Sequence, residues 1–140
     1  MHNTQLIRFK RHTDEYGSLT PVEAGVDIPF DIKRIYYIYD VPPDVMRGFH
    51  SHKNLHQVLI PLNGAVSIRL KTPFEETDVH LDKPYEGLYI GPNIWREMYG
   101  FTPGSTLLVL ASEYYDEADY IRCLNVYKNT YPFTQNGDIK

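Results

Sequence analysis

The stretch Arg47-Gly48-Phe49-His50-Ser51-His52 leads into the apolar run Val58-Leu59-Ile60-Pro61-Leu62 and the turn Asn63-Gly64. If the first stretch is extended, His50 and His52 project from the same face, because strand side chains alternate with a period of two. Two imidazoles on one surface can ligate a metal ion, or they can move protons near neutral pH. A solvated loop that carries two histidines is the alternative interpretation of this spacing.

The rest of the chain repeats a pattern of short strands separated by turns. β-Branched and aromatic residues gather in short runs bounded by Gly, Pro, Asn and Asp, which is typical of a β-sandwich or barrel. We expect this barrel to span about residues 5–112. The predicted strands include Leu6–Lys10, Ile32–Tyr39, Val58–Leu62, Ala65–Leu70, Thr77–Leu81, Gly87–Ile90 and Thr106–Ala111.

The turn Asn63-Gly64 is a strong hairpin signal, so the strands on either side of it are predicted to pair with each other. In the second of these strands, alternate residues from Val66 to Leu70 would face the core, and the opposite face, with Ser67 and Arg69, could line a cavity. Beyond the barrel, apolar residues at three- and four-residue spacing and acidic residues near the start predict one C-terminal helix over about residues 115–128.

The composition limits the class of protein. At 140 residues the chain is long enough for one domain and too short for two ordinary ones. A net charge of −4 argues against a general nucleic-acid binder held by phosphate contacts. Only one cysteine is present, Cys123, and the start of the chain has no signal-peptide pattern, so we expect a cytoplasmic protein. No apolar run approaches the ~20 residues that cross a bilayer, so no membrane association is expected.

The order of these features resembles the cupins, small β-barrels of the double-stranded β-helix or jelly-roll type. Metal-binding cupins carry His-x-His, then Glu, then Gly, with a final His in a second motif. Here His50, His52 and Gly64 match, but Gln57 stands at the Glu position and Arg96 at the last His position. These exchanges remove two metal ligands. The resemblance implies an all-β cupin domain over residues 1–140 with a short C-terminal α-helix. The two exchanges favour a site with no metal and histidines that act as acid–base groups, although His56 is an alternative ligand if it can reach the same face.

A more specific resemblance rests on seven stretches in order along the chain: Gly17–Leu19, Ile28–Ile38, Arg47–Lys53, Gln57–Ile60, Leu62–Gly64, Gly87–Pro92 and Leu110–Arg122. Together they resemble the nucleotide-sugar 3,4-ketoisomerases. These are cupins that convert dTDP-4-keto-6-deoxy-glucose into a dTDP-3-keto-6-deoxyhexose for amino-sugar synthesis. The resemblance implies an isomerase that binds a dTDP-linked 4-keto-6-deoxy sugar and needs no cofactor.

The resemblance also implies roles for individual residues. His52 is expected to be the base that carries hydrogen between C3 and C4, while His50 handles protons on the two oxygens, directly or through a water. Tyr37 is the candidate donor to the developing enolate oxygen, with Tyr36 as the alternative. Core packing with a satisfied hydroxyl is the competing interpretation of each tyrosine.

The two phosphates of dTDP require local cations in a protein of negative net charge. Arg47 is the first candidate, and Lys33, Arg34 and Arg69 lie on predicted strands that could face the same cavity. Lys33 and Arg34 point opposite ways along one strand, so only one is expected to face inward. The thymine base is expected to stack on an aromatic ring that the sequence does not single out.

Two positions bear on the product. In this family an Arg and a His at the positions of Tyr16 and Arg96 resemble the branch with a galacto-configured product, whereas Tyr and Arg resemble the branch with a gluco-configured one. We therefore expect dTDP-3-keto-6-deoxy-glucose. A turn residue at Tyr16 and a surface ion pair at Arg96 are the alternatives. A homodimer is also expected, in which the strand Leu6–Lys10 could cross to the partner and Tyr16 could serve the partner's site.

Three other functions remain open from the sequence. A dTDP-sugar 3,5-epimerase also uses a cupin and a histidine base, but the tandem histidines and the stretch Ser112–Glu117 favour the ketoisomerase. A non-catalytic sugar-nucleotide-binding cupin would bind without turnover. A metal-dependent cupin oxygenase would use His50 and His52 as ligands.

Overall fold

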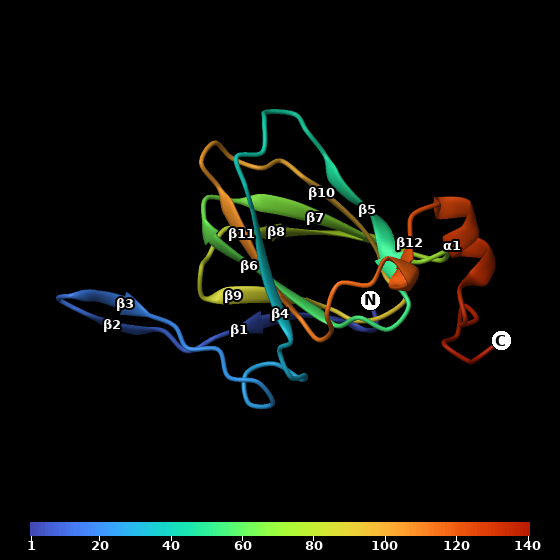
Figure 1. The fold of residues 1–140 in the computed structure, drawn as a ribbon, viewed down its shortest axis with the longest axis horizontal. Helices are drawn as coiled ribbons and strands as arrows, with labels where there is room; N and C mark the ends of the chain where they lie inside the picture. Colours follow the sequence, from blue (N-terminus) through green and yellow to red (C-terminus); the bar gives the residue numbers. More distant parts are fainter.

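The computed structural model describes all residues, 1–140, and shows a β-barrel with a short C-terminal helix (Figure 1). No helix in it has the length and apolar character needed to cross a membrane. The elements, in chain order, are β1 (Thr4–Arg8), β2 (His12–Asp14), β3 (Gly17–Leu19), β4 (Arg34–Tyr39), β5 (Arg47–His52), β6 (Gln57–Asn63), β7 (Val66–Lys71), β8 (Glu76–Leu81), β9 (Glu86–Ile90), β10 (Trp95–Tyr99), β11 (Thr106–Ala111), a 3-10 turn (Glu117–Asp119), β12 (Tyr120–Ile121) and α1 (Leu124–Thr130).

Two five-stranded sheets form the barrel, in the orders β1-β9-β6-β11-β4 and β12-β5-β10-β7-β8. All pairings within them are antiparallel. Inward-facing side chains of both sheets meet in one core cluster, which includes Leu59 and Leu88 from the first sheet and Ile68 and Met98 from the second. Burial of these apolar surfaces is the main favourable term in folding. The predicted all-β cupin jelly roll with a short C-terminal helix is confirmed.

The predicted hairpin at Asn63-Gly64 is wrong in its pairing. β6 pairs with β11 and β9, whereas β7 pairs with β10 and β8, so the chain crosses from one sheet to the other at this turn. The tight reversal itself is present, with Gly64 at φ +71°. A turn signal reports that the chain reverses locally, but the apolar residues on both faces of β6 place this strand in the middle of its own sheet.

Arg69 lies on the outer face of its sheet. Its guanidinium binds the carboxylate of Asp78 on β8, with Nε 2.9 Å from Oδ1, and lies over the ring of Tyr99. The expectation that this face of β7 could line a cavity is therefore wrong. In the jelly roll the alternate residues Val66, Ile68 and Leu70 fill the interior, so their neighbours face solvent.

The C-terminal segment differs from the single helix predicted over about residues 115–128. Residues 117–119 form one 3-10 turn, whose cap Asp116 accepts a hydrogen bond from the backbone N–H of Ala118, and β12 then pairs with β5 before α1 begins at Leu124. The three- and four-residue spacing of apolar residues in this segment does not mark one helix face, because these residues make contacts with two different parts of the barrel. Tyr120 lies against the histidines of β5, while Tyr127 packs on Trp95 of β10.

The hairpin of β2 and β3 extends away from the barrel as an arm (Figure 1). Its strands pair only with each other, and Tyr16 at its tip is 90% exposed. Within the arm the turn is defined by a hydrogen bond from the backbone N–H of Tyr16 to the carboxylate of Asp14. β1, by contrast, pairs with β9 of the same chain along its whole length.

The crossing between the sheets provides a test of the fold. Gly64 has φ +71°, and a Cβ there would lie 2.5 Å from Oγ1 of Thr102 and 2.8 Å from Cβ of Ser105. Gly104 has a similar φ of +74° with nothing within 4 Å of its Cβ position. We expect Gly104→Ala to lower the free energy of unfolding by about 1–2 kcal/mol through backbone strain alone. Gly64→Ala should cost roughly 1–3 kcal/mol more through overpacking.

Urea denaturation of the two variants measures both effects. Equal losses of stability in Gly64→Ala and Gly104→Ala would contradict the close packing described at the crossing.

Candidate active site

β5 carries the two histidines into the interior of the barrel. His50 and His52 are 8% and 0% exposed, and their ring centroids lie 4.9 Å apart at an interplanar angle of 86°. A bulge precedes them: Gly48 and Phe49 have positive φ, and the register with β10 shifts at this point, so that Arg96 lies opposite His50. Bulges of this kind redirect side chains next to functional sites. The predicted common surface of the two imidazoles is confirmed.

A segment after β11, residues 113–122, covers the outer side of the histidines; we call it the strap. Its Tyr120 ring lies 4.3 Å from the His52 ring and 5.0 Å from the His50 ring, centroid to centroid. Its Asp119 places Oδ2 3.0 Å from Nδ1 of His52. The strap is stabilised internally by Glu117, which binds the guanidinium of Arg122 and accepts a hydrogen bond from the Tyr115 hydroxyl.

Behind the histidines a buried guanidinium joins the two sheets. Arg96 of β10 donates to the side-chain oxygen of Gln57 on β6 and to the backbone carbonyl of Ile94, 3.0 Å away. The amide nitrogen of Gln57 in turn donates to the hydroxyl of Tyr36 on β4, at 2.9 Å. Arg96 is 1% exposed, and its hydrogen bonds go to neutral oxygens rather than to a carboxylate.

These residues do not suit the metal ion that many cupins hold. Gln57 uses its side-chain oxygen to accept from Arg96, and a cation occupies the place of the last histidine. No group of three or more His, Cys, Asp or Glu side chains is placed to hold a metal ion. The guanidinium beside the two imidazoles has no lone pair to offer a metal, and its charge repels a divalent cation.

Burial and the nearby cation keep both imidazoles neutral. Desolvation, followed by the charge of Arg96, lowers the pKa of His50 from 6.5 to about 4. The same two causes lower the pKa of His52 further. Burial also lowers the pKa of Arg96, to about 10, which leaves the guanidinium charged at neutral pH. The site thus holds one fixed positive charge and two neutral groups that can accept protons.

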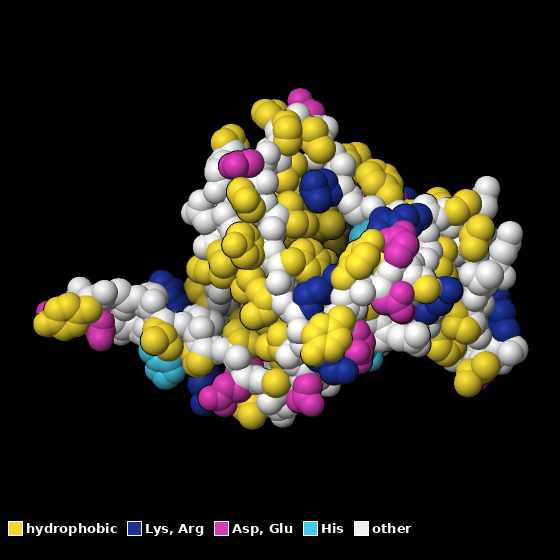
Figure 2. Space-filling model, viewed as in Figure 1, with side chains coloured by type: hydrophobic (Ala, Val, Ile, Leu, Met, Phe, Trp, Pro, Cys, Tyr) yellow, Lys and Arg dark blue, Asp and Glu magenta, His cyan; other side chains and the backbone are white.

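Two cavities meet at the strap. One of them, which we call the arginine cavity, has a volume of about 510 Å³ and is lined by His50, Tyr36, Tyr37 and three arginines, among other residues. The arginines are Arg34, Arg47 and Arg122, and no carboxylate lines this cavity. Figure 2 shows this face of the molecule hollowed, with dark blue Lys and Arg side chains around the hollow and a cyan histidine at its edge.

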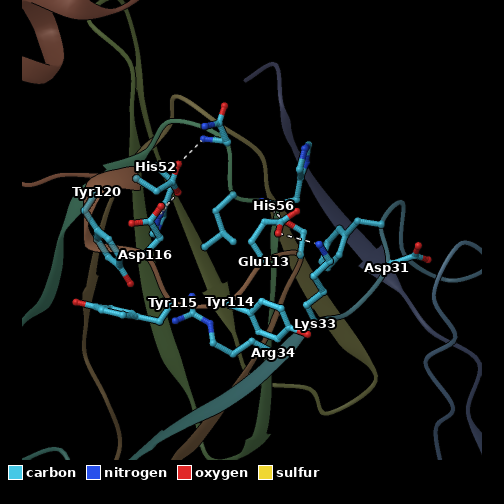
Figure 3. Close-up of a pocket in the computed structure, with 15 residues that line it drawn as sticks. Asp31, Lys33, Arg34, His52, His56, Glu113, Tyr114, Tyr115, Asp116 and Tyr120 are labelled. Carbon is cyan, nitrogen blue, oxygen red and sulfur yellow. Dashed lines mark hydrogen bonds and ion pairs between the residues drawn. The ribbon is translucent and has the colours of Figure 1, made fainter.

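The acidic cavity, of about 790 Å³, lies on the other side of the strap. Figure 3 shows His52 and Tyr120 on one side of it and the ion pair of Lys33 and Glu113 on the other. Four carboxylates line it against two cations, so it is the less favourable place for a phosphate. The carboxylates are those of Asp31, Glu113, Asp116 and Asp119.

The predicted site residues fall into four groups. Five line the arginine cavity, namely His50, Tyr36, Tyr37, Arg34 and Arg47, and Arg34 has a buried Nε without a hydrogen-bond partner. His52 and Lys33 line the acidic cavity, where the Lys33 ammonium lies 3.0 Å from the Glu113 carboxylate. Arg96 lies behind the imidazoles. The remaining two, Tyr16 and Arg69, lie away from both cavities of their own chain.

Tyr36 and Tyr37 occupy opposite faces of β4. Tyr36 points into the barrel, where its hydroxyl meets Gln57. Tyr37 is 60% exposed and packs on Tyr39 at the rim of the arginine cavity. The geometry therefore favours the alternative candidate, Tyr36, for contact with a group bound between the histidines.

Comparison with known proteins assigns the chain to a family. Residues 2–131 match the family described as WxcM-like, C-terminal (FdtA). The chain belongs to this family. It is 46% identical over 124 residues, 89% of each chain, to the TDP-4-oxo-6-deoxy-alpha-D-glucose-3,4-oxoisomerase of Aneurinibacillus thermoaerophilus.

Solved structures of family members have the same fold. The 3,4-ketoisomerase QdtA of Thermoanaerobacterium thermosaccharolyticum, in complex with TDP, is 60% identical with a TM-score of 0.92 over 94% of this chain and 96% of that one. The TDP-quinovose 3,4-ketoisomerase WlaRB of Campylobacter jejuni is 43% identical with a TM-score of 0.90 over 93% of this chain and 100% of that one. The resemblance inferred from the sequence is confirmed.

The sequence did not single out the strap residues of this family member. Asp119, Tyr120 and Arg122 lie in a stretch that carries the resemblance, but the acidic residues there predict the first turn of a helix, whereas the structure has a single 3-10 turn. No local signal distinguishes the two conformations, because Asp116 caps the 3-10 turn as it would cap a longer helix.

The low pKa of His50 predicts how stability depends on pH. Between about pH 4 and 6.5 the unfolded chain binds a proton on this imidazole and the folded protein does not, so acid favours unfolding. One such group contributes a slope of up to about 1.4 kcal/mol per pH unit, with stability rising as pH rises. We expect His50→Gln to flatten the curve in this window.

Urea denaturation between pH 4.5 and 7.5 measures the slope, and His12→Gln is a matched control because His12 lies exposed on the arm. If His50→Gln and the wild-type protein show the same slope, His50 is not kept neutral by burial.

Proposed function

We propose that this protein is a nucleotide-sugar 3,4-ketoisomerase that converts dTDP-4-keto-6-deoxy-D-glucose to dTDP-3-keto-6-deoxy-D-glucose. The observation that carries the proposal is the pair of neutral, buried imidazoles, of which His50 lines the cavity with three arginines. Imidazoles can take and return protons, and arginines match the two phosphates of a nucleotide diphosphate. Family membership and the 3,4-ketoisomerase activity named for the relatives support the isomerisation.

The reaction needs two proton movements. The ketone at C4 acidifies the hydrogen on C3, a base removes it to form an enediol(ate), and a proton added to C4 leaves the ketone at C3. A second proton moves from the oxygen on C3 to the oxygen on C4. In our proposal His52 carries the first proton through its Nε2, which is buried without a partner, and His50 serves the oxygens.

Arg96 acts on both the histidines and the intermediate. Its buried charge stabilises the negative charge that develops on the enediolate in a site with little water. Entry of a substrate with two phosphates offsets part of this positive charge. The pKa of each imidazole then rises from its low value in the free protein, toward the range in which it exchanges protons efficiently.

Tyr36 is the candidate donor to the enolate oxygen. Arg96 donates to the oxygen of the Gln57 amide, which orients the amide so that its nitrogen donates to the Tyr36 hydroxyl. Because this hydroxyl already accepts a hydrogen bond, its own proton is free to be donated to a ligand in the arginine cavity.

The two tyrosines of β4 offer a matched test. We expect Tyr36→Phe to lower kcat by about 10²–10³-fold, the scale set by loss of one donor to a developing oxyanion, with little change in KM. Tyr37→Phe, which removes the same hydroxyl on the outer face, should retain kcat. Steady-state kinetics of both variants decides the assignment, and the reverse order of effects would restore Tyr37 as the donor.

The arginine cavity is our proposed site for the diphosphate. Arg34 and Arg47 line it, and the carboxylate of Glu117 already neutralises Arg122. Lys33 is likewise paired with Glu113, so it is a weaker candidate. Arg34 is the stronger candidate for a phosphate contact than Arg47. Its buried Nε has no hydrogen-bond partner in the protein, and a phosphate oxygen could accept a hydrogen bond from it.

The proposed gluco product rests on Tyr16 and Arg96, the pair that resembles this branch of the family. A relative of this chain, WlaRB, is described as a TDP-quinovose 3,4-ketoisomerase, and quinovose has the gluco configuration. Side chains at these positions would turn the sugar ring and so decide which face of C4 receives the proton.

We also propose that the protein is a homodimer in which the arm carries Tyr16 to the partner's site. The arm has exposed Tyr16 and Leu19 and no strand pairing with its own barrel. The edge strand β4 exposes Ile35, Tyr37 and Tyr39 beside the arginine cavity. A second copy of the chain can cover both surfaces at once.

Mixed dimers test this arrangement. His52→Asn should inactivate its own barrel, and Tyr16→Ala should impair whichever barrel Tyr16 serves. Co-expression of the two variants should restore one working site per dimer if Tyr16 acts across the interface, because the barrel with an intact His52 then receives an intact arm. Activity no higher than that of the Tyr16→Ala homodimer would place Tyr16 in the site of its own chain.

The activity itself is tested by proton NMR of dTDP-4-keto-6-deoxy-glucose incubated with the protein in deuterated buffer, with and without chelator. We expect a 3-keto product, unaffected by chelator, with the C4 coupling of the gluco configuration. His52→Asn should abolish turnover and retain binding of dTDP. Exchange at C5 would indicate a 3,5-epimerase instead, and binding without any reaction would indicate a sugar-nucleotide-binding protein.

A further inference from the structure

Asp119 has contacts that packing of the strap alone does not require. Its carboxylate is 14% exposed and lies between β5 and the 3-10 turn. Oδ2 lies 3.0 Å from Nδ1 of His52, and Oδ1 accepts the backbone N–H of Asn54 at 2.8 Å. The backbone carbonyl of Asp119 also accepts the N–H of Lys53, at 3.0 Å. One residue of the strap is thus bound to three consecutive residues that begin with His52.

These contacts define which nitrogen of His52 carries the proton. A carboxylate oxygen can only accept, so Nδ1 must be the donor in this hydrogen bond. In a neutral imidazole the proton is then absent from Nε2. The Nε2 atom is buried and has no partner within the protein.

We propose that Asp119 is a positioning residue that holds His52 in the tautomer protonated on Nδ1, so that Nε2 is free to accept a proton from substrate. The inference rests on the proposed function for its catalytic consequence, while the tautomer itself is a property of the free protein. Asp119 touches no reacting atom in this role. It acts only through the imidazole that it orients.

The second contact of Asp119 allows this role to be separated from anchoring of the strap. In Asp119→Asn the side-chain oxygen must still accept the N–H of Asn54, since an amide nitrogen cannot. The amide nitrogen is therefore directed at Nδ1 of His52 and donates to it. The variant retains the anchor and forces the proton onto Nε2, where the imidazole can no longer accept.

Asp116→Asn is a matched control. It removes the same charge from the same 3-10 turn, and asparagine caps a helical turn as well as aspartate does. Asp116 makes no hydrogen bond to His52. We expect Asp119→Asn to lower kcat by about 10²-fold or more with KM changed less than about threefold, and Asp116→Asn to match the wild-type protein.

A second readout needs no substrate. Long-range proton–nitrogen correlation spectra of nitrogen-15-labelled protein report which ring nitrogen of each histidine is protonated, and His52→Asn identifies the signals of His52. We expect the Nδ1-protonated form in the wild-type protein and the Nε2-protonated form in Asp119→Asn. This readout decides the inference even if the protein turns over no sugar nucleotide, and so separates its failure from that of the proposed function.

Two results overturn the inference. One is an Nε2-protonated His52 in the wild-type protein, which can be observed whether or not the variant folds. The other is an unchanged tautomer and unchanged kcat in a folded Asp119→Asn.

Discussion

The site depends on one buried charge, the guanidinium of Arg96, which is held by neutral oxygen acceptors and by no carboxylate. An unpaired ion in a protein interior costs several kcal/mol of desolvation, so the fold must supply that stability elsewhere. The core cluster between the two sheets is the evident source. The chain has retained a charge where an apolar residue would be more stable, which is common at functional sites.

Three properties of the site follow from this charge. Added to the larger effect of burial, it lowers the pKa of both imidazoles. It also orients the Gln57 amide and through it the Tyr36 hydroxyl, and it occupies the position where other cupins hold a metal ligand. In the reaction proposed above, electrostatic stabilisation of an oxyanion would thus come from a side chain of the protein.

The sequence predicted the features that depend on local periodicity and missed those that depend on which sheet a strand joins. The common face of His50 and His52 follows from the strand period, and the substitutions Gln57 and Arg96 could be identified at their motif positions. The sequence could not show that Arg69 faces solvent, because an Asn-Gly turn does not reveal that β7 joins a different sheet from β6. Asp119 was missed because its acidic neighbours suggested a helix start, whereas tertiary contacts with β5 determine the conformation there.

The hydrogen bond between His52 and Asp119 joins residues 67 positions apart, and those of Arg96 with Gln57 and of Gln57 with Tyr36 span 39 and 21. The barrel itself depends on pairings that are as distant, such as Thr4 with Ile90 and Arg34 with Ala111. Every such contact requires the entropy of closing a long loop to be overcome. The site is therefore assembled by the same long-range closures as the barrel, and no short segment of the chain could hold these side chains in place by itself.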